Sequence, residues 1–189
     1  DMSGLWAQLD QAEAVSNVFL DNLKTATPWV LKAVGVEYLL NQAEQVGNIL
    51  HIATHFSNLI KVSENVVVRR MAGAALLSIA PQLTPDRRNE IAVELSKALE
   101  TGQAEISQYI PEYLGRFSLW LSPRELDEVL DQMMTLLSSA NTGVVAAALS
   151  TVGAMLEHYG EYGGRFPESP ESLTARRDRM AGLPLQRPA

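Results

Sequence analysis

The sequence contains no cysteine, and this absence excludes several kinds of site. Without thiols, the 189-residue chain can form neither a disulfide framework nor a cysteine-ligated zinc site, and it has no thiol redox chemistry. Aromatic residues make up only 6% of the chain, whereas Ala, Leu and Val are abundant, which favours helices over sheets. No apolar run approaches the roughly 18 residues that a membrane span needs. The start, Asp1-Met2-Ser3-Gly4, also lacks the basic and apolar regions of a signal peptide, so we expect a cytoplasmic protein without a membrane partner.

Positive charge is also in short supply. The chain carries 15 Lys and Arg residues against 22 Asp and Glu residues, which gives a net charge of −7. Because contacts to phosphate need a basic face, this balance argues against a nucleic-acid partner. The hydrophobic content of 47% is ordinary for a folded domain with a sizeable core.

One short phrase occurs twice in the chain. Leu83-Thr84-Pro85 opens one helical stretch and Leu121-Ser122-Pro123 opens another, 38 positions later (121 − 83 = 38). Ser or Thr followed by Pro is typical of a helix start, because the hydroxyl can accept from a free backbone amide and Pro needs no amide hydrogen there. The same punctuation occurs at Thr27-Pro28 and Ser169-Pro170. A period in the high thirties with two helices per unit predicts an α-solenoid.

Apolar spacing of three and four residues predicts the helices of each unit. We expect a kink at Pro111, a flexible connection over 160–167, and a helix after Ser169 that ends at Gly182 without a second helix to cover it. The expected helices span 5–24, 27–41, 46–61, 66–80, 84–99, 104–121, 122–137 and 144–159. The predicted core includes Phe19, Ile52, Phe56, Leu76, Ile79, Ile91, Leu95, Leu114, Val129, Met133, Val152 and Met155.

Two of these segments resemble the second (B) helix of HEAT repeats. They are Val66-Val-Val-Arg-Arg-Met-Ala-Gly-Ala-Ala-Leu-Leu-Ser-Ile-Ala80 and Thr142-Gly-Val-Val-Ala-Ala-Ala-Leu-Ser-Thr-Val-Gly153. The resemblance implies an all-α fold, a right-handed α-α superhelix of about three HEAT-like helix pairs with the B helices on its concave face. In this interpretation, irregular N-terminal helices (1–44) cap the repeats (45–159). Residues 160–189 form a loop, an incomplete fourth repeat and a poorly ordered tail.

A second resemblance concerns residues 17–40 and the repeats that follow them. This region is similar to the helical part that follows the catalytic domain in some large bacterial HD-domain phosphohydrolases. The sequence has no adjacent His-Asp pair, so the resemblance implies a non-catalytic, regulatory part. Because the fourth unit is incomplete, we expect a truncated product or a piece of a longer protein, with possible self-association through an uncovered apolar C-terminal end.

His51 and His55 have the i, i+4 spacing at which two imidazoles can share a zinc ion. A third ligand is needed, and no Glu follows His51, so the zinc-protease motif fails. We therefore expect structural histidines and no metal or other cofactor. Glu90, Glu94, Glu125 and Glu128 are expected to lie on solvated helix faces.

The remaining candidates for binding are an aromatic stripe and three Arg pairs, which are Arg69-Arg70, Arg87-Arg88 and Arg176-Arg177. Tyr109, Tyr113, Phe117 and Trp120 share one helix face, which is either core or a partner-binding stripe, with Tyr109 and Tyr113 expected to show an exposed edge. The predicted function is a non-catalytic interaction or regulatory scaffold that binds a protein or peptide. The alternatives are a regulatory fragment of an HD-type phosphohydrolase or a HEAT-like nucleic-acid-binding enzyme. The predicted contact residues are Arg69, Arg70, Tyr109, Glu112 and Arg116.

Overall fold

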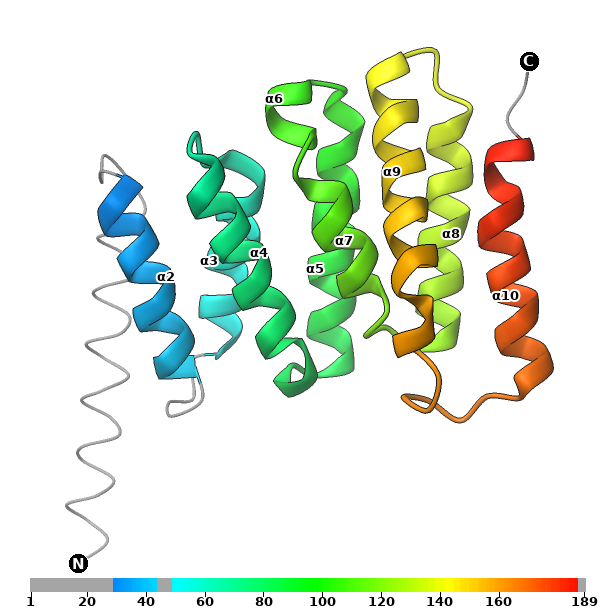
Figure 1. Ribbon diagram of the computed structural model, residues 1–189, viewed down its shortest axis with the longest axis horizontal. Coiled ribbons are helices and arrows are strands. Elements are labelled where there is room, and N and C mark those ends of the chain that lie inside the picture. Colours follow the sequence, from blue (N-terminus) through cyan, green and yellow to red (C-terminus); the bar gives the residue numbers. More distant parts are fainter. Residues whose placement is uncertain (1–28, 44–48, 187–189) are drawn as a thin grey trace, which may run out of the picture. The chain divides into compact units, whose positions relative to one another are not determined.

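All regular secondary structure is helical in the residues that the structure describes, which are 29–43 and 49–186 of this computed structural model (Figure 1). The chain divides into two compact units, an N-terminal unit of residues 1–83 and a C-terminal unit of residues 84–189. The expected helix over 5–24, its core residue Phe19 and the Thr27-Pro28 start lie outside the described residues. Within the described residues, no helix is both long enough and apolar enough to cross a membrane.

In the N-terminal unit, three helices pack on one another. They are α2 (Trp29–Ala43), α3 (Ile49–Val62) and α4 (Val66–Ile79), and a short 3-10 helix, η1 (Ala80–Gln82), follows α4. Asn65 caps α4, because its side-chain oxygen accepts from the backbone amides of Val67 at 2.9 Å and Val68 at 3.2 Å. Phe56 and Leu76 are fully buried in the core of this unit.

The C-terminal unit is built from consecutive helices that fold back on one another. Helix α7 packs against α5 and α9, α8 packs against α5 and α9, and α10 packs against α9. Helices α8 and α9 run side by side in opposite directions (Figure 1). The elements are α5 (Pro85–Ala98), η2 (Leu99–Thr101), α6 (Ala104–Ser107), α7 (Ile110–Ser118), α8 (Pro123–Leu137), α9 (Thr142–His158), η3 (Tyr159–Glu161), α10 (Pro170–Gly182) and η4 (Leu183–Gln186).

The helix starts predicted from Ser/Thr-Pro are confirmed in this unit. The hydroxyl oxygens of Thr84, Ser122 and Ser169 each accept from a backbone amide three residues on, at 3.4, 3.4 and 3.1 Å. In each case the following proline is the first residue of the helix. Helices α5 and α8 therefore begin 38 residues apart (123 − 85 = 38).

The core prediction is also confirmed. Each predicted core residue that lies in the described part of the chain is buried. Leu95, Leu114, Met133 and Met155 have no exposed surface at all. The apolar spacing of the sequence thus identified the inward faces of α3, α4, α5, α7, α8 and α9.

The prediction of one kinked helix over 104–121 is wrong. The structure has two helices there, α6 and α7, separated at Gln108 and Tyr109. Pro111 lies in the first turn of α7, where its missing amide hydrogen costs nothing. Because proline has no amide hydrogen to bond the carbonyl four residues back, that of Ser107, and its ring clashes with that carbonyl, α6 ends at Ser107 and the chain starts a new helix rather than bending one.

Two predictions of flexibility near the C-terminus also differ from the structure. In the 160–167 connection, Tyr162 is buried and donates to the carbonyl of Leu121 at 3.0 Å, and Arg165 donates to the carbonyl of Leu119 at 2.7 Å. Past Gly182, the chain forms η4, and Leu183 is fully buried. Residues 187–189 lie outside the described residues, so a poorly ordered tail stays a prediction there.

Candidate functional site

The predicted contact residues of the N-terminal unit lie next to each other on α4 but in different environments. The Arg69 side chain is buried, and its Nη2 donates to the carbonyl of Lys61 at 2.7 Å. Arg70 is exposed. Arg69 therefore links α4 to the end of α3, whereas Arg70 is accessible to a partner.

The other predicted contact residues lie on or beside α7 in the C-terminal unit. Tyr109 precedes the helix and is partly exposed, Glu112 is exposed, and Arg116 is partly exposed. Their spacing of three and four residues places them along one side of the helix. The five predicted residues thus form two sets, one in each unit.

The aromatic stripe is mostly core. Tyr113 and Phe117 are buried, so the expectation of an exposed edge at Tyr113 is wrong, while Tyr109 fits it. Trp120 is partly exposed and is flanked by two guanidinium groups. That of Arg165 lies 3.6 Å from the ring centroid and that of Arg88 lies 5.8 Å from it. These contacts are of cation–π type.

The two arginines beside Trp120 also have a structural task. Arg88 donates to the carbonyl of Trp120 at 3.2 Å, and Arg165 donates to that of Leu119. Burial lowers the pKa of both guanidinium groups from the usual value. The cluster therefore satisfies carbonyls that follow α7, which would otherwise lack partners.

His51 and His55 lie on α3, with His51 exposed and His55 buried. The ring of His55 lies 6.4 Å from that of Phe56. No three His, Cys, Asp or Glu side chains in the described ranges converge in a way that would hold a metal ion.

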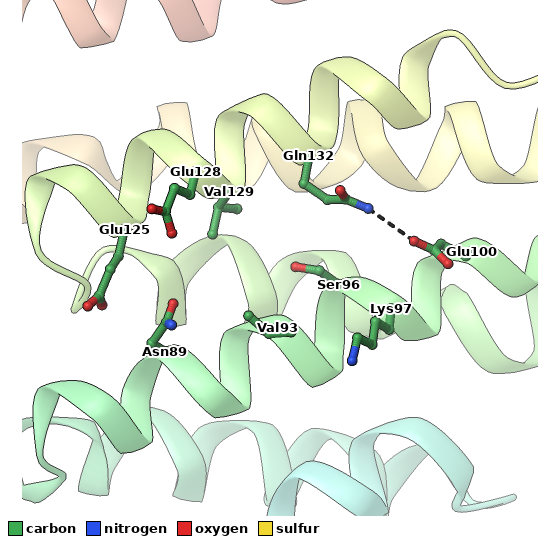
Figure 2. Close-up of a pocket in the computed structure, with 9 residues that line it drawn as sticks. All are labelled: Asn89, Val93, Ser96, Lys97, Glu100, Glu125, Glu128, Val129 and Gln132. Atoms are coloured by element: carbon green, nitrogen blue, oxygen red, sulfur yellow. Dashed lines mark hydrogen bonds between the residues drawn. The ribbon is translucent and has the colours of Figure 1, made fainter.

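A groove lies between α5 and α8 in the C-terminal unit (Figure 2). It encloses about 270 Å³. Gln132 on α8 donates to Glu100 at 3.0 Å and joins the two helices at one end, while Glu125 and Glu128 lie toward the other end. The groove is lined by Asn89, Val93, Ser96, Lys97, Glu100, Glu125, Glu128, Val129 and Gln132.

The carboxylate of Glu125 is the least compensated charge of this groove. Its Oε2 is buried and has no hydrogen-bond partner. Burial raises the pKa of Glu125 above its usual value, the negative charges of Glu128 and Asp86 raise it further, and Arg124 opposes them. The expectation that Glu125 is an ordinary solvated carboxylate is therefore wrong, whereas Glu128 is exposed as expected.

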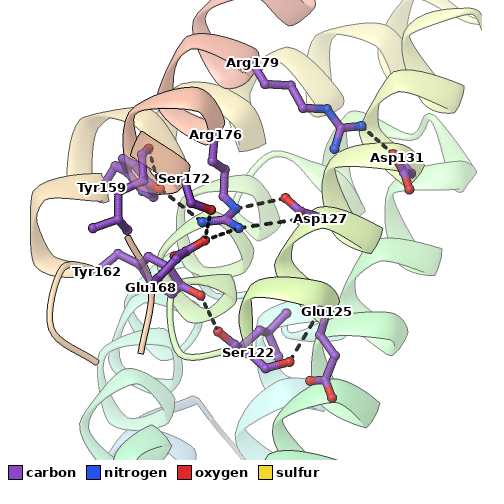
Figure 3. A network of polar contacts seen from close by, with 12 residues as sticks. Ser122, Glu125, Asp127, Asp131, Tyr159, Tyr162, Glu168, Ser172, Arg176 and Arg179 are labelled. Atoms are coloured by element: carbon purple, nitrogen blue, oxygen red, sulfur yellow. Dashed lines mark hydrogen bonds and ion pairs between the residues drawn. The ribbon is translucent and has the colours of Figure 1, made fainter. Parts of the chain in front are cut away.

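A second polar cluster fastens α10 to the rest of the unit (Figure 3). The Arg176 side chain is buried, and its Nε donates to Asp127 on α8 at 2.9 Å. Its Nη2 lies 2.6 Å from an oxygen of Glu168, and its Nη1 donates to the hydroxyl of Tyr159 at 3.3 Å. Although burial alone would lower the pKa of Arg176, hydrogen bonds to Glu168, Asp127 and Tyr159 raise it. This arginine is therefore a fixed cation inside the structure.

The surface of α10 that faces away from this cluster is mainly polar. Glu171, Thr174, Arg177 and Asp178 are exposed, and Met180 is fully buried. Arg179 adds an exposed ion pair with Asp131 on α8. Leu185 in η4, which follows α10, is an exposed apolar side chain, and self-association through the C-terminal end stays a prediction.

Comparison with known proteins gives no family to which the chain can be assigned. No protein-family model, curated protein or solved structure matches it. Any inference about the function of the described residues therefore rests on their geometry alone. That geometry offers a partly apolar groove with an excess of carboxylates, two accessible helix faces and internal ion pairs.

Proposed function

We propose that this chain is a non-catalytic protein-interaction or regulatory module of the HEAT-repeat type, with helix pairs stacked as an α-solenoid. The observation that carries the proposal is the 38-residue recurrence of one packing unit. Helices α5 and α8 begin at equivalent prolines with the same hydroxyl cap, and each is followed by a helix that packs against it. Solenoids of this kind use rows of helix faces as extended binding surfaces.

The binding faces in this proposal are the second helices of the pairs, which are α4 in the N-terminal unit and α7 and α9 in the C-terminal unit. Arg70 on α4 and Glu112 on α7 are exposed, and Tyr109 and Arg116 are partly exposed. Tyr and Arg concentrate binding energy at protein interfaces, because a large flat side chain loses little conformational freedom on burial. Arg69 takes an internal role, because it is buried and donates to the carbonyl of Lys61.

The same role suits a regulatory part of a longer enzyme, including an HD-type phosphohydrolase whose catalytic domain lies elsewhere. The partner is then another domain rather than another protein. A cytoplasmic location stays the expectation that the cysteine-free composition favours.

Site-specific photo-crosslinking tests this proposal. A photoreactive amino acid replaces Glu112 on α7 in one variant and Glu171, an exposed residue of α10, in the control. After irradiation in a lysate of the source cell, we expect a discrete crosslinked protein from position 112 that is absent from position 171. Arg116→Glu in the same chain should abolish that product. Equal labelling from both positions, or no discrete product from position 112, would contradict the proposal.

A further inference from the structure

The groove between α5 and α8 lies on the first helices of two of the proposed pairs, and none of the residues assigned to partner binding above lines it. We propose that this groove binds the side chain of one lysine or arginine of a protein partner. This inference rests on the proposed function and deepens it, because it names the chemistry of a second contact with the same class of partner.

The size of the groove suits one long side chain. Its volume of about 270 Å³ is below the range of roughly 300–1,000 Å³ typical of sites for whole small molecules. Val93 on α5 and Val129 on α8 supply apolar surface between the polar residues (Figure 2). Lysine and arginine have aliphatic stems that cover such surface while the charged head lies in a polar environment.

The charge of the groove selects a cation. Three carboxylates line it, those of Glu100, Glu125 and Glu128, against one ammonium, that of Lys97. Lys97 is itself within 3.7 Å of Glu94, which lies outside the groove. The lining residues therefore leave a net negative charge where a partner would enter, and charge complementarity favours a basic group.

Glu125 provides the position at which that basic group is held. One of its carboxylate oxygens is buried without a hydrogen-bond partner, and a buried acceptor in that state is costly. The neighbouring Arg124 compensates this charge only indirectly, because it is exposed and pairs with Glu128 at 3.7 Å. The side-chain amide of Asn89 lines the groove opposite Glu125 (Figure 2). Because Glu125 as a residue is partly exposed, a guanidinium or ammonium group at this end would compensate the negative charge of its carboxylate.

The test uses the full chain and defined peptides. The probes are alanine pentapeptides, capped at both ends, with arginine, lysine or the uncharged norleucine at the centre. Titration is followed by two-dimensional amide NMR at low ionic strength. We expect saturable shifts in residues 89–100 and 125–132 with the two basic peptides and none with the norleucine peptide, and we expect added salt to weaken binding.

Two charge-matched variants separate groove binding from general attraction to an acidic protein. Glu125→Gln removes a carboxylate of the groove, and Glu157→Gln removes an exposed carboxylate of α9. We expect about tenfold weaker binding of the arginine peptide to the first variant, the size of effect of one charged hydrogen bond, and no change with the second. A cooperative thermal unfolding transition like that of the parent chain, seen for both variants, confirms that they fold.

The proposal is overturned by three results. The first is that the two variants weaken binding of the arginine peptide equally. The second is that the peptide shifts amide signals only in residues outside α5 and α8. The third is that Mg²⁺ or Ca²⁺ binds at the same residues and displaces the peptide. Failure here is distinguishable from failure of the proposed function. If position 112 still crosslinks a partner, only the groove assignment falls. If the groove binds the peptides and position 112 crosslinks nothing, the proposed binding face falls instead.

Discussion

Replacing Gly115 by alanine tests how closely α7 and α9 approach each other. A Cβ atom at this position would lie 2.7 Å from the Cβ of Ala154, 2.8 Å from the carbonyl oxygen of Thr151 and 3.1 Å from the backbone nitrogen of Met155. Carbon atoms in favourable contact are about 3.5–4.0 Å apart. Two of the three neighbours are backbone atoms of α9, so no side-chain rotation can relieve the clash and the helices would have to move apart.

Gly153 provides a matched control at the corresponding position of the following helix pair. It lies on α9, 38 residues after Gly115 (153 − 115 = 38), and no atom lies within 4 Å of the position that its Cβ would take. Alanine is preferred over glycine in a helix by about 0.5–1 kcal/mol, and both variants receive this gain. The difference between them therefore isolates the overpacking cost, which is about 1–3 kcal/mol.

Urea unfolding of the two variants measures this difference directly. We expect Gly153→Ala to equal or exceed the parent chain in unfolding free energy and Gly115→Ala to fall below Gly153→Ala by about 1–3 kcal/mol. Adding Ala154→Gly to Gly115→Ala should restore only part of the loss, because the contact with Thr151 remains. Equal stability of the two single variants would refute the close approach of α7 and α9.

Leu114→Ala should lower the unfolding free energy by about 2–5 kcal/mol, because Leu114 is fully buried, and a loss under about 0.5 kcal/mol in urea unfolding would place it at the surface. Arg176→Met should speed hydrogen exchange in residues 170–183, since it leaves buried acceptors unpaired, whereas Arg177→Met at an exposed position should not. The hydrogen bond from Arg176 holds the pKa of Glu168 below its usual 4.5, so the ionised carboxylate stabilises the parent above pH 4.5. The parent should lose this contribution to its unfolding free energy as the pH falls through the lowered pKa, and the Glu168→Gln variant should not show that loss in an acid titration. Burial raises the pKa of Glu125, so its ionised carboxylate destabilises the parent at pH 7. Glu125→Gln should therefore be more stable than the parent at pH 7 and lose that advantage below the usual pKa of 4.5, as measured by thermal unfolding across pH.

The features that the sequence predicted correctly depend on local physics. A hydroxyl before a proline sets a helix start through contacts within four residues, which is why Thr84, Ser122 and Ser169 cap the helices expected of them. The inward faces follow from the period of 3.6 residues, which requires no knowledge of the partner helix. Leu114 and Met133 are buried for this reason.

The features that the sequence did not predict depend on how helices pair. Arg176 is of a residue type that is usually exposed, and its partner Asp127 is 49 residues away. The stripes that line the groove have ordinary helical spacing on α5 and α8, but which stripe of α5 faces which stripe of α8 is set by packing. For the same reason Glu125 looked solvated in the sequence.

The buried connection after α9 has a mechanical consequence for the C-terminal unit. Tyr162 and Arg165 follow the α8–α9 pair, yet they donate to the carbonyls of Leu121 and Leu119, which follow α7. In stacked helix pairs, each pair is related to the next by a small rotation. Here any change in that rotation at the end where α7 and α9 terminate must break two hydrogen bonds that lie partly or wholly out of water. These hydrogen bonds therefore hold the α5–α7 and α8–α9 pairs to each other, and under an applied force this unit should resist bending and extension.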